Sequence, residues 1–159
     1  MNQFMVPLRW IGNLLRRNPS VARVALGCIP NRHVHIHLAD VGRFRIHLRR
    51  HRSLWLLPLS TLEWYPFAAL KHLIRPGDIV WDVGGNIGVY ARWLAAQTQA
   101  AHIYTFEPMT ENLNDLAHNI SIGSLSHRVT IVPWALLDRN GDVDFQIDDV
   151  QSASGAVSD

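Results

Sequence analysis

The sequence has a single cysteine and no long hydrophobic run, and each shortage excludes a class of protein. Cys28 is the only cysteine among 159 residues, which excludes a disulfide framework and a cysteine-based zinc cluster. No apolar run approaches the roughly 18 residues that a membrane-spanning helix needs, so we expect no spanning segment. The apolar stretch 4–15 is interrupted by Arg9 and lacks a small-residue cleavage site, which argues against a signal peptide. We therefore expect a reducing, cytoplasmic compartment.

Charge is unevenly divided along the chain. The sequence contains 15 Lys and Arg residues and 13 Asp and Glu residues, a net charge of +2. Residues 1–75 hold 12 of the basic residues and only two acids, whereas residues 76–159 hold 3 basic residues and 11 acids. The basic half is expected to attract anions. Its partner is left open between an anionic membrane surface, an acidic glycan and the acidic half of the same chain.

Residues 1–75 predict a helix, a β-hairpin and a second helix. Apolar residues recur at helical spacing over residues 4–15, which favours a helix docked on the domain over one lying on a membrane. Residues 33–48 predict a hairpin whose three-residue loop places Gly42 in the left-handed conformation. The expected register pairs Ile36 with Phe44 and Val34 with Ile46. Residues 55–58 predict a short strand, and residues 61–74 a helix.

Three alternating histidines raise the question of a metal site. His33, His35 and His37 share one face of the predicted strand, opposite Arg43 and Arg45. Arginine neighbours disfavour a bound cation, and no carboxylate lies on this face of the hairpin. We therefore predict a solvated basic face and no metal.

From residue 76 onward, strands and helices alternate. Residues 79–83 form an apolar run of the kind buried on both faces of a parallel sheet. This alternation predicts an α/β fold with a doubly wound parallel sheet. The expected elements are strands at 79–83, 102–106, 129–132 and 143–147 and helices at 87–97 and 110–120, followed by a polar tail at 148–159.

A glycine-rich turn between the first parallel strand and its helix carries the chemical information. Gly84 permits a sharp turn off the strand, Gly85 permits close approach of a ligand, and Gly88 permits tight packing of the helix. Glu107 ends the next strand, 19 residues after Gly88, where an acid accepts hydrogen bonds from ribose hydroxyls. The turn lacks the dinucleotide-binding glycine spacing. Asp82 would repel a pyrophosphate but suits a cationic amino-acid group, as in S-adenosylmethionine.

The same residues resemble the FkbM-type methyltransferases. The resemblance covers about residues 76–147, and Gly85 stands where that family usually has alanine. It rests on four segments, which are Asp82-Val83-Gly84-Gly85-Asn86-Ile87-Gly88, Phe106-Glu107-Pro108, Asn112-Leu113 with Asn119-Ile120, and Ala135-Leu136-Leu137-Asp138 with Gly141.

The resemblance implies a class I, Rossmann-like fold and an S-adenosylmethionine-dependent enzyme that methylates a hydroxyl of a sugar or natural product. It implies a small-molecule or glycan acceptor. Because the basic residues are scattered and no known nucleic-acid motif appears, we expect no nucleic acid. The charge of the basic half leaves open a peripheral contact with an anionic surface. No catalytic base is assigned. The cofactor-binding residues that the resemblance implies are Asp82, Gly84, Gly85, Asn86, Gly88, Glu107, Pro108, Trp134 and Ala135.

The family continues into a further core strand that nothing after Ile147 supplies, so we expect an incomplete sheet and a fragment of a longer protein. We divide the chain into a basic extension (1–75), a partial cofactor-binding core (76–147) and a tail (148–159). Two other functions remain open. One is a non-catalytic module that retains the fold, and the other is a protein that binds or methylates nucleic acid.

Overall fold

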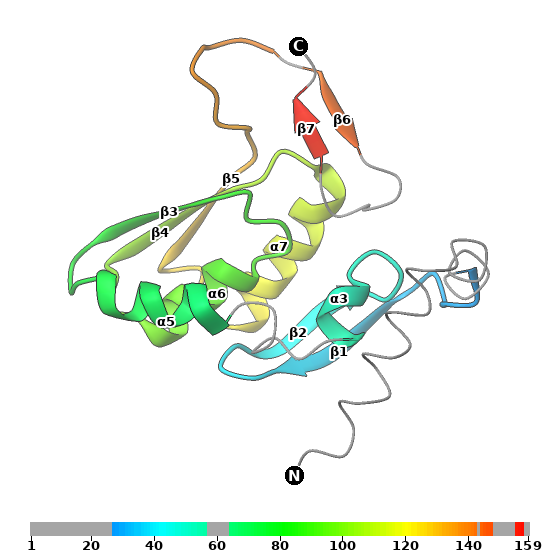
Figure 1. Cartoon of the computed structure of the whole chain (residues 1–159), viewed down its shortest axis with the longest axis horizontal. Helices are drawn as coiled ribbons and strands as arrows, with labels where there is room; N and C mark the ends of the chain where they lie inside the picture. The colour runs from blue at the N-terminus through cyan, green and yellow to red at the C-terminus, as the bar shows by residue number, and fades with distance from the viewer. Residues whose placement is uncertain (1–26, 57–63, 143, 148–154, 158–159) are drawn as a thin grey trace.

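The computed structural model describes residues 27–56, 64–142, 144–147 and 155–157 (Figure 1). The predicted helix at 4–15 lies outside these residues. The elements in chain order are β1 (His33–Leu38), β2 (Gly42–His47), α3 (Arg52–Leu56), α5 (Trp64–Leu73), β3 (Ile79–Val83), α6 (Val89–Gln97), β4 (His102–Phe106), α7 (Thr110–Ile122), β5 (Val129–Val132), β6 (Phe145–Ile147) and β7 (Gly155–Val157).

The β1–β2 hairpin has the predicted register. Ile36 pairs with Phe44, and Val34 pairs with Ile46. Gly42 adopts a φ of 88°, and Asp40 in the loop adopts 62°, so the turn requires the left-handed conformation that glycine tolerates best. Alternation along the strands therefore separates an apolar face from a basic face.

The central sheet is parallel, with strand order β3-β4-β5. Strands β3 and β4 are each an apolar run followed by a helix, and the α6 and α7 crossovers carry the chain back to start the next parallel strand. Helix α6 begins two residues after the predicted start at 87, and α7 ends two residues after the predicted end at 120. In Figure 1 these helices and α5 lie on one side of the sheet. The predictions at 79–83, 102–106 and 129–132 match β3, β4 and β5 residue for residue.

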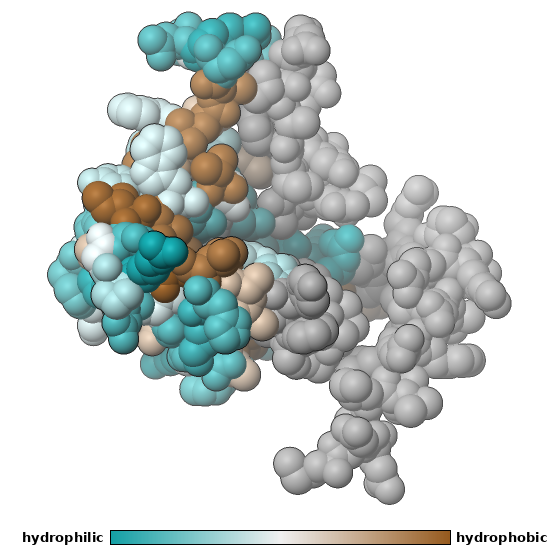
Figure 2. All heavy atoms as spheres, turned by 60° about the vertical axis from the view of Figure 1, so that its left-hand side comes forward, coloured by the Kyte–Doolittle hydropathy of each residue, from teal (hydrophilic) through white to brown (hydrophobic). Residues whose placement is uncertain are grey.

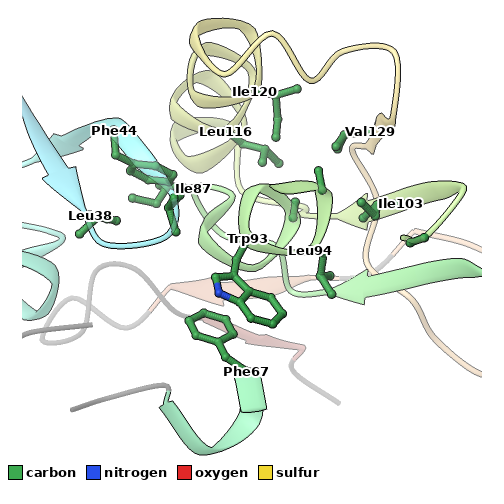
Figure 3. Close-up of a cluster of buried hydrophobic side chains, with 14 of the residues drawn as sticks. Leu38, Phe44, Phe67, Ile87, Trp93, Leu94, Ile103, Leu116, Ile120 and Val129 are labelled. Carbon is green, nitrogen blue, oxygen red and sulfur yellow. The ribbon is translucent and has the colours of Figure 1, made fainter. Parts of the chain in front are cut away.

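One hydrophobic core joins the hairpin to the sheet and its helices (Figure 3). Phe44 and Ile46 of β2 are fully buried in the same cluster as Ile103 of β4 and Leu116 of α7. Arg92 of α6 reinforces this junction because its guanidinium donates to the carbonyl oxygens of Val41, at 2.8 Å, and Arg43. On α5, Phe67 stacks on Trp93 with ring centroids 4.4 Å apart, as Figure 3 shows.

The opposite face of the sheet is uncovered at β3. Ile79, Trp81 and Val83 point to this face and are 61–63% exposed. Hydrophobic side chains gather on the side of the molecule that Figure 2 brings forward. Strand β3 is also an edge strand within the described residues, as expected for an incomplete doubly wound sheet.

Two predictions of local structure are wrong. Residues 52–56 form helix α3, whereas a strand was expected from residue 55. Backbone hydrogen bonds from His51 to His47 and from Leu54 to His51 start this helical turn, and the Trp55 indole donates to the Leu48 carbonyl at 2.9 Å. The polar tail contains strand β7, which pairs with β6 in antiparallel register. No helix in the described part of the chain is long and apolar enough to cross a membrane.

Candidate functional site

The turn after β3 is built from left-handed residues. Gly84, Asn86 and Gly88 have φ values of 84°, 48° and 91°. The backbone N–H groups of Gly84 and Gly85 both donate to the Phe106 carbonyl at 2.9 Å, and Gly88 N–H donates to the Gly85 carbonyl at 2.8 Å. The loop is thereby fixed to the end of β4. No atom lies within 4 Å of the position that a Cβ on Gly84 would take, so the loop is open there.

The other two glycines are packed against the protein itself. A Cβ on Gly85 would lie 1.9 Å from the Thr105 hydroxyl oxygen, and one on Gly88 would lie 2.6 Å from Leu116 Cδ1. The sequence predicted that Gly85 would allow a ligand to approach closely. It also predicted that Gly88 would allow the following helix to pack tightly on the strand. The structure instead puts the β4 side chain of Thr105 beside Gly85 and helix α7 beside Gly88.

Glu107 connects the glycine turn to the start of α7. Its carboxylate is 5% exposed. Oε2 accepts from the backbone N–H of Asn86 at 2.8 Å, while Oε1 accepts from Met109 N–H at 2.9 Å and from the Asn112 amide at 3.4 Å. Because an ionised carboxylate has about four acceptor positions, these bonds leave capacity for a further donor. Glu107 therefore orders the loop as well as presenting an acceptor.

Asp82 is a second acid at this edge of the sheet. Its Oδ2 accepts a hydrogen bond from the Thr105 hydroxyl at 3.0 Å. Burial raises the pKa of Asp82, and the neighbouring charge of Glu107 adds to the rise, while the Thr105 hydrogen bond opposes it. Since burial penalises the carboxylate anion, a cation bound beside Asp82 would offset that cost.

The remaining predicted residues follow strands β4 and β5. Glu107 N–H donates to the Val132 carbonyl at 3.0 Å, so these two strand ends lie side by side. Pro108 and Ala135 are partly buried, and Trp134 is 69% exposed. The structure therefore gathers the carboxyl ends of β3, β4 and β5 at one edge, which is where open α/β sheets bind ligands.

Three side chains of the site had no role in the sequence-based prediction. Thr105 holds Asp82, Asn112 holds Glu107, and the Asn119 amide donates to the Ile87 carbonyl in the glycine turn at 3.0 Å. Both asparagines belong to the segments that carry the FkbM resemblance, which was the available signal for them. Nothing in the sequence pattern singled out Thr105.

The histidine face gains a carboxylate from outside the hairpin. Asp115 of α7 is 1% exposed, and its Oδ1 lies 3.1 Å from His33 Nε2 and 2.9 Å from Arg45 Nε. Sequence reasoning considered only the hairpin and missed this acid. No group of three or more His, Cys, Asp or Glu residues in the described part of the chain is arranged to hold a metal ion.

No family model matches the sequence, and no curated protein matches it. Several solved structures are similar in fold. A transferase from Pyrococcus horikoshii has a TM-score of 0.53 at 12% identity, covering 67% of this chain and 37% of its own. A SAM-dependent methyltransferase from Agrobacterium tumefaciens has a TM-score of 0.49 at 15% identity, with 64% and 32% covered. The complex of aTrm5 with tRNALeu has a TM-score of 0.48 at 18% identity, with 66% and 29% covered.

The Pyrococcus likeness shows the fold. The chain has an incomplete Rossmann-like α/β fold, whose described residues include a parallel three-stranded sheet. The chain spans about two fifths or less of the length of the structures it matches.

The comparisons correct one prediction. The expectation that no nucleic acid takes part is wrong, because the similar structures include rRNA methylases and a Trm5 bound to tRNALeu.

Proposed function

We propose that this chain binds S-adenosylmethionine at the carboxyl edge of its parallel sheet and serves a SAM-dependent methyltransferase. The observation that carries the proposal is the connection between the glycine turn and Glu107. The turn opens at Gly84, and the acid at the end of the neighbouring strand is hydrogen-bonded to the turn through Asn86. A preformed turn with an acid beside it is what a nucleoside-containing cofactor needs.

The residues present fit this cofactor. Asp82 is partly buried, and burial makes its ionised form less favourable. The ammonium group of the methionine moiety would offset this penalty on the carboxylate anion. The turn from Gly84 to Gly88 would pass beside that moiety, and the remaining acceptor position of Glu107 suits a ribose hydroxyl. Pro108, Trp134 and Ala135 would flank the adenine. These assignments rest on the sequence resemblance and on the placement of the strand ends.

The protein's own part in the chemistry would be to bind and orient. When bound, S-adenosylmethionine supplies an electrophilic methyl group. The left-handed turn and the Glu107 hydrogen bonds hold the cofactor-facing backbone in one geometry, and orientation of this kind supplies much of the rate enhancement in group transfer. No described side chain is assigned as a catalytic base.

The resemblance to FkbM-type enzymes supports oxygen as the methylated atom, and we include O-methylation of a hydroxyl in the proposal. The molecule that carries the hydroxyl is not restricted. We include RNA among the acceptors to be tested.

Calorimetric titration with S-adenosylhomocysteine tests the cofactor site. The wild-type chain is expected to bind with a Kd on the order of micromolar. Gly84→Ala is expected to reduce affinity at least about tenfold, because a β-carbon at positive φ strains the turn and enters the open side of the loop. Glu107 variants are less informative, since Glu107 also holds Asn86 and Met109.

Gly77→Ala is the matched control. Gly77 has a φ of 89° and an equally empty surrounding, but it precedes β3 and lies at the opposite end of that strand from Gly84. Both variants carry the same backbone strain, so Gly77→Ala should keep the wild-type Kd. Equal Kd values in all three proteins would show that the site is misplaced. Binding without methyl transfer to any hydroxyl acceptor would favour the non-catalytic module.

A further inference from the structure

The outer face of the β1–β2 hairpin carries a compact array of basic side chains. The register places His33 opposite His47, His35 opposite Arg45 and His37 opposite Arg43. Alternate residues of a strand point to the same side, so all six share one face. We call these six residues the His–Arg face. The apolar side chains of the same strands turn inward to the core.

The permanent positive charge of the His–Arg face comes from the guanidinium groups of Arg43 and Arg45. Like charges directly opposite each other across a strand pair are destabilising, and here Arg43 and Arg45 stand opposite two imidazoles. Asp115, which is 1% exposed, forms ion pairs with His33, Arg45 and Arg50. One buried carboxylate is therefore shared by three basic groups, and within the part of the chain that the structure describes no ion pair is seen for His35, His37 or Arg43.

The outer part of this face is accessible. His35, His37 and Arg43 are exposed, and His118 of α7 extends the array because its ring lies 3.3 Å from His35 by the nearest nitrogens. None of the exposed large hydrophobic residues of the described chain lies on β1 or β2. A membrane-surface helix or patch needs apolar groups to enter the bilayer, so a lipid surface is the weaker candidate partner.

We propose that the His–Arg face binds single-stranded RNA through its phosphates. Guanidinium groups pair with phosphate oxygens, and single-strand recognition also uses flat side chains such as histidine on which bases stack. A two-stranded surface that alternates imidazole and guanidinium groups offers both contacts. The inference goes beyond cofactor binding and does not depend on it, so it is tested without the cofactor.

Two histidines at this face make the binding sensitive to pH. Burial lowers the pKa of His47, and the charges of Arg50, His33 and Arg49 lower it further against the opposing effect of Asp115. His51, the other ring close to His47, is buried and has its own pKa lowered to about 4.

His118 behaves in the same way. Burial lowers its pKa, followed by the charges of Arg45, His35 and Arg43, and Asp115 again opposes them. A polyanion on the face would favour the protonated imidazoles, so binding takes up protons. Affinity should therefore rise as the pH falls below about 6.5, the ordinary histidine pKa from which both values are lowered.

The test is fluorescence anisotropy with a labelled oligouridylate of roughly 12 nucleotides. At about 50 mM salt and a pH near 6, the wild-type chain should bind with a Kd on the order of micromolar. The logarithm of the binding constant should fall with log salt at a slope of about −3, as for roughly four phosphates on a single strand. The combined variant His35→Ala, His37→Ala and Arg43→Ala should bind at least about tenfold more weakly.

The combined variant Lys71→Ala, His72→Ala and Arg75→Ala is the control. It also removes three exposed basic residues, but from the end of α5 and the turn after it, and it should keep the wild-type Kd within about twofold. Thermal unfolding checks that both variants fold, and Arg43→Glu alone provides a second, single-site test at the hairpin.

Equal loss of affinity in the hairpin and control variants would overturn the proposal, since it would show a diffuse charge effect. Failure of the folded wild-type chain to bind the oligouridylate at low salt would also overturn it. Binding to phosphatidylserine vesicles without binding to RNA would assign the face to a membrane instead. None of these outcomes bears on the titration with S-adenosylhomocysteine.

Discussion

Gly85 and Thr105 share one small volume between β3 and β4. The Thr105 hydroxyl stands where a β-carbon on Gly85 would be, and it donates to Asp82. In the family that the turn resembles, alanine is usual at the position of Gly85. The glycine is therefore matched to the threonine, because a methyl group and this hydroxyl cannot occupy the same space.

This coupling gives a prediction for a double-mutant cycle. Gly85→Ala alone should lower the free energy of unfolding by about 1–3 kcal/mol, the usual cost of overpacking. In the Thr105→Ala background the same change should cost less than about 0.5 kcal/mol, because the hydroxyl is gone. Urea unfolding of the four proteins measures the cycle. Additive costs would contradict the steric explanation.

His51 gives the protein a specific sensitivity to acid. The ring is 3% exposed, and its Nδ1 accepts a hydrogen bond from His47 N–H at 2.9 Å. Burial lowers the pKa of His51 from 6.5 to about 4. The folded protein therefore holds this ring neutral, and protonation would remove the acceptor.

The pH dependence follows from the lowered pKa. The unfolded chain binds the His51 proton more tightly, so stability is complete above pH 6.5 and is lost as the pH falls toward 4. The free energy of unfolding should be about 2 kcal/mol lower near pH 5 than near pH 7 from this residue alone. His51→Asn keeps an acceptor near Nδ1 but cannot titrate. Urea unfolding should show a smaller loss between these pH values in the variant, and an equal loss would assign the effect to other groups.

At the scale of elements, the parallel strands could be predicted because each is a short apolar run, and because a helix follows each of the first two. The hairpin register could be predicted because a one-residue slip would turn Phe44 and Ile46 to solvent. Helix α3 could not be predicted, because its residues show no helical periodicity and Trp55 is fixed by a hydrogen bond to the Leu48 carbonyl. Strand β7 could not be predicted, because its three residues are too few to give an alternating pattern and it forms by pairing with β6.

The candidate site is likewise divided between features that the sequence predicted and features that it did not. The glycine turn and Glu107 are local signals at the ends of adjacent strands. The contacts of Asn119 are not local, because they join α7 to a strand 74 residues earlier. Its Oδ1 accepts from Arg45 N–H at 2.7 Å, and its Nδ2 donates to the carbonyls of Arg45 and Ile87, both at 3.0 Å. Asn119 thus fastens three elements together.

Removing this side chain should loosen the junction. Asn119→Ala leaves buried backbone groups of Arg45 and Ile87 without partners, and we expect a loss of about 3 kcal/mol in the free energy of unfolding. Asn114→Ala is the matched control, since Asn114 is an exposed asparagine on the same helix. It should change stability by less than about 0.5 kcal/mol. Equal effects of the two changes on the free energy of unfolding would show that the hydrogen bonds of Asn119 contribute no more to stability than an exposed asparagine does.

At the scale of the whole molecule, β3 combines a free edge with an uncovered apolar face. Within the described residues no strand pairs with its outer edge, and its side chains Ile79, Trp81 and Val83 are exposed. Backbone groups at such an edge are a template for pairing with another chain, and natural proteins block such edges with charged side chains. The 159-residue chain is therefore expected to self-associate through β3 as its concentration rises.

The variants Ile79→Lys and Leu73→Lys distinguish association through the edge of β3 from association through exposed apolar area in general. The two side chains are similarly exposed, at 63% and 70%, but Ile79 lies on β3 and Leu73 ends helix α5. Both changes should alter the free energy of unfolding by less than about 0.5 kcal/mol, because neither side chain is buried. Only Ile79→Lys places a charge on the strand edge, so sedimentation velocity should show less self-association for this variant and wild-type behaviour for Leu73→Lys. Equal improvement in both would indicate that exposed apolar area, and not the free edge of β3, drives the association.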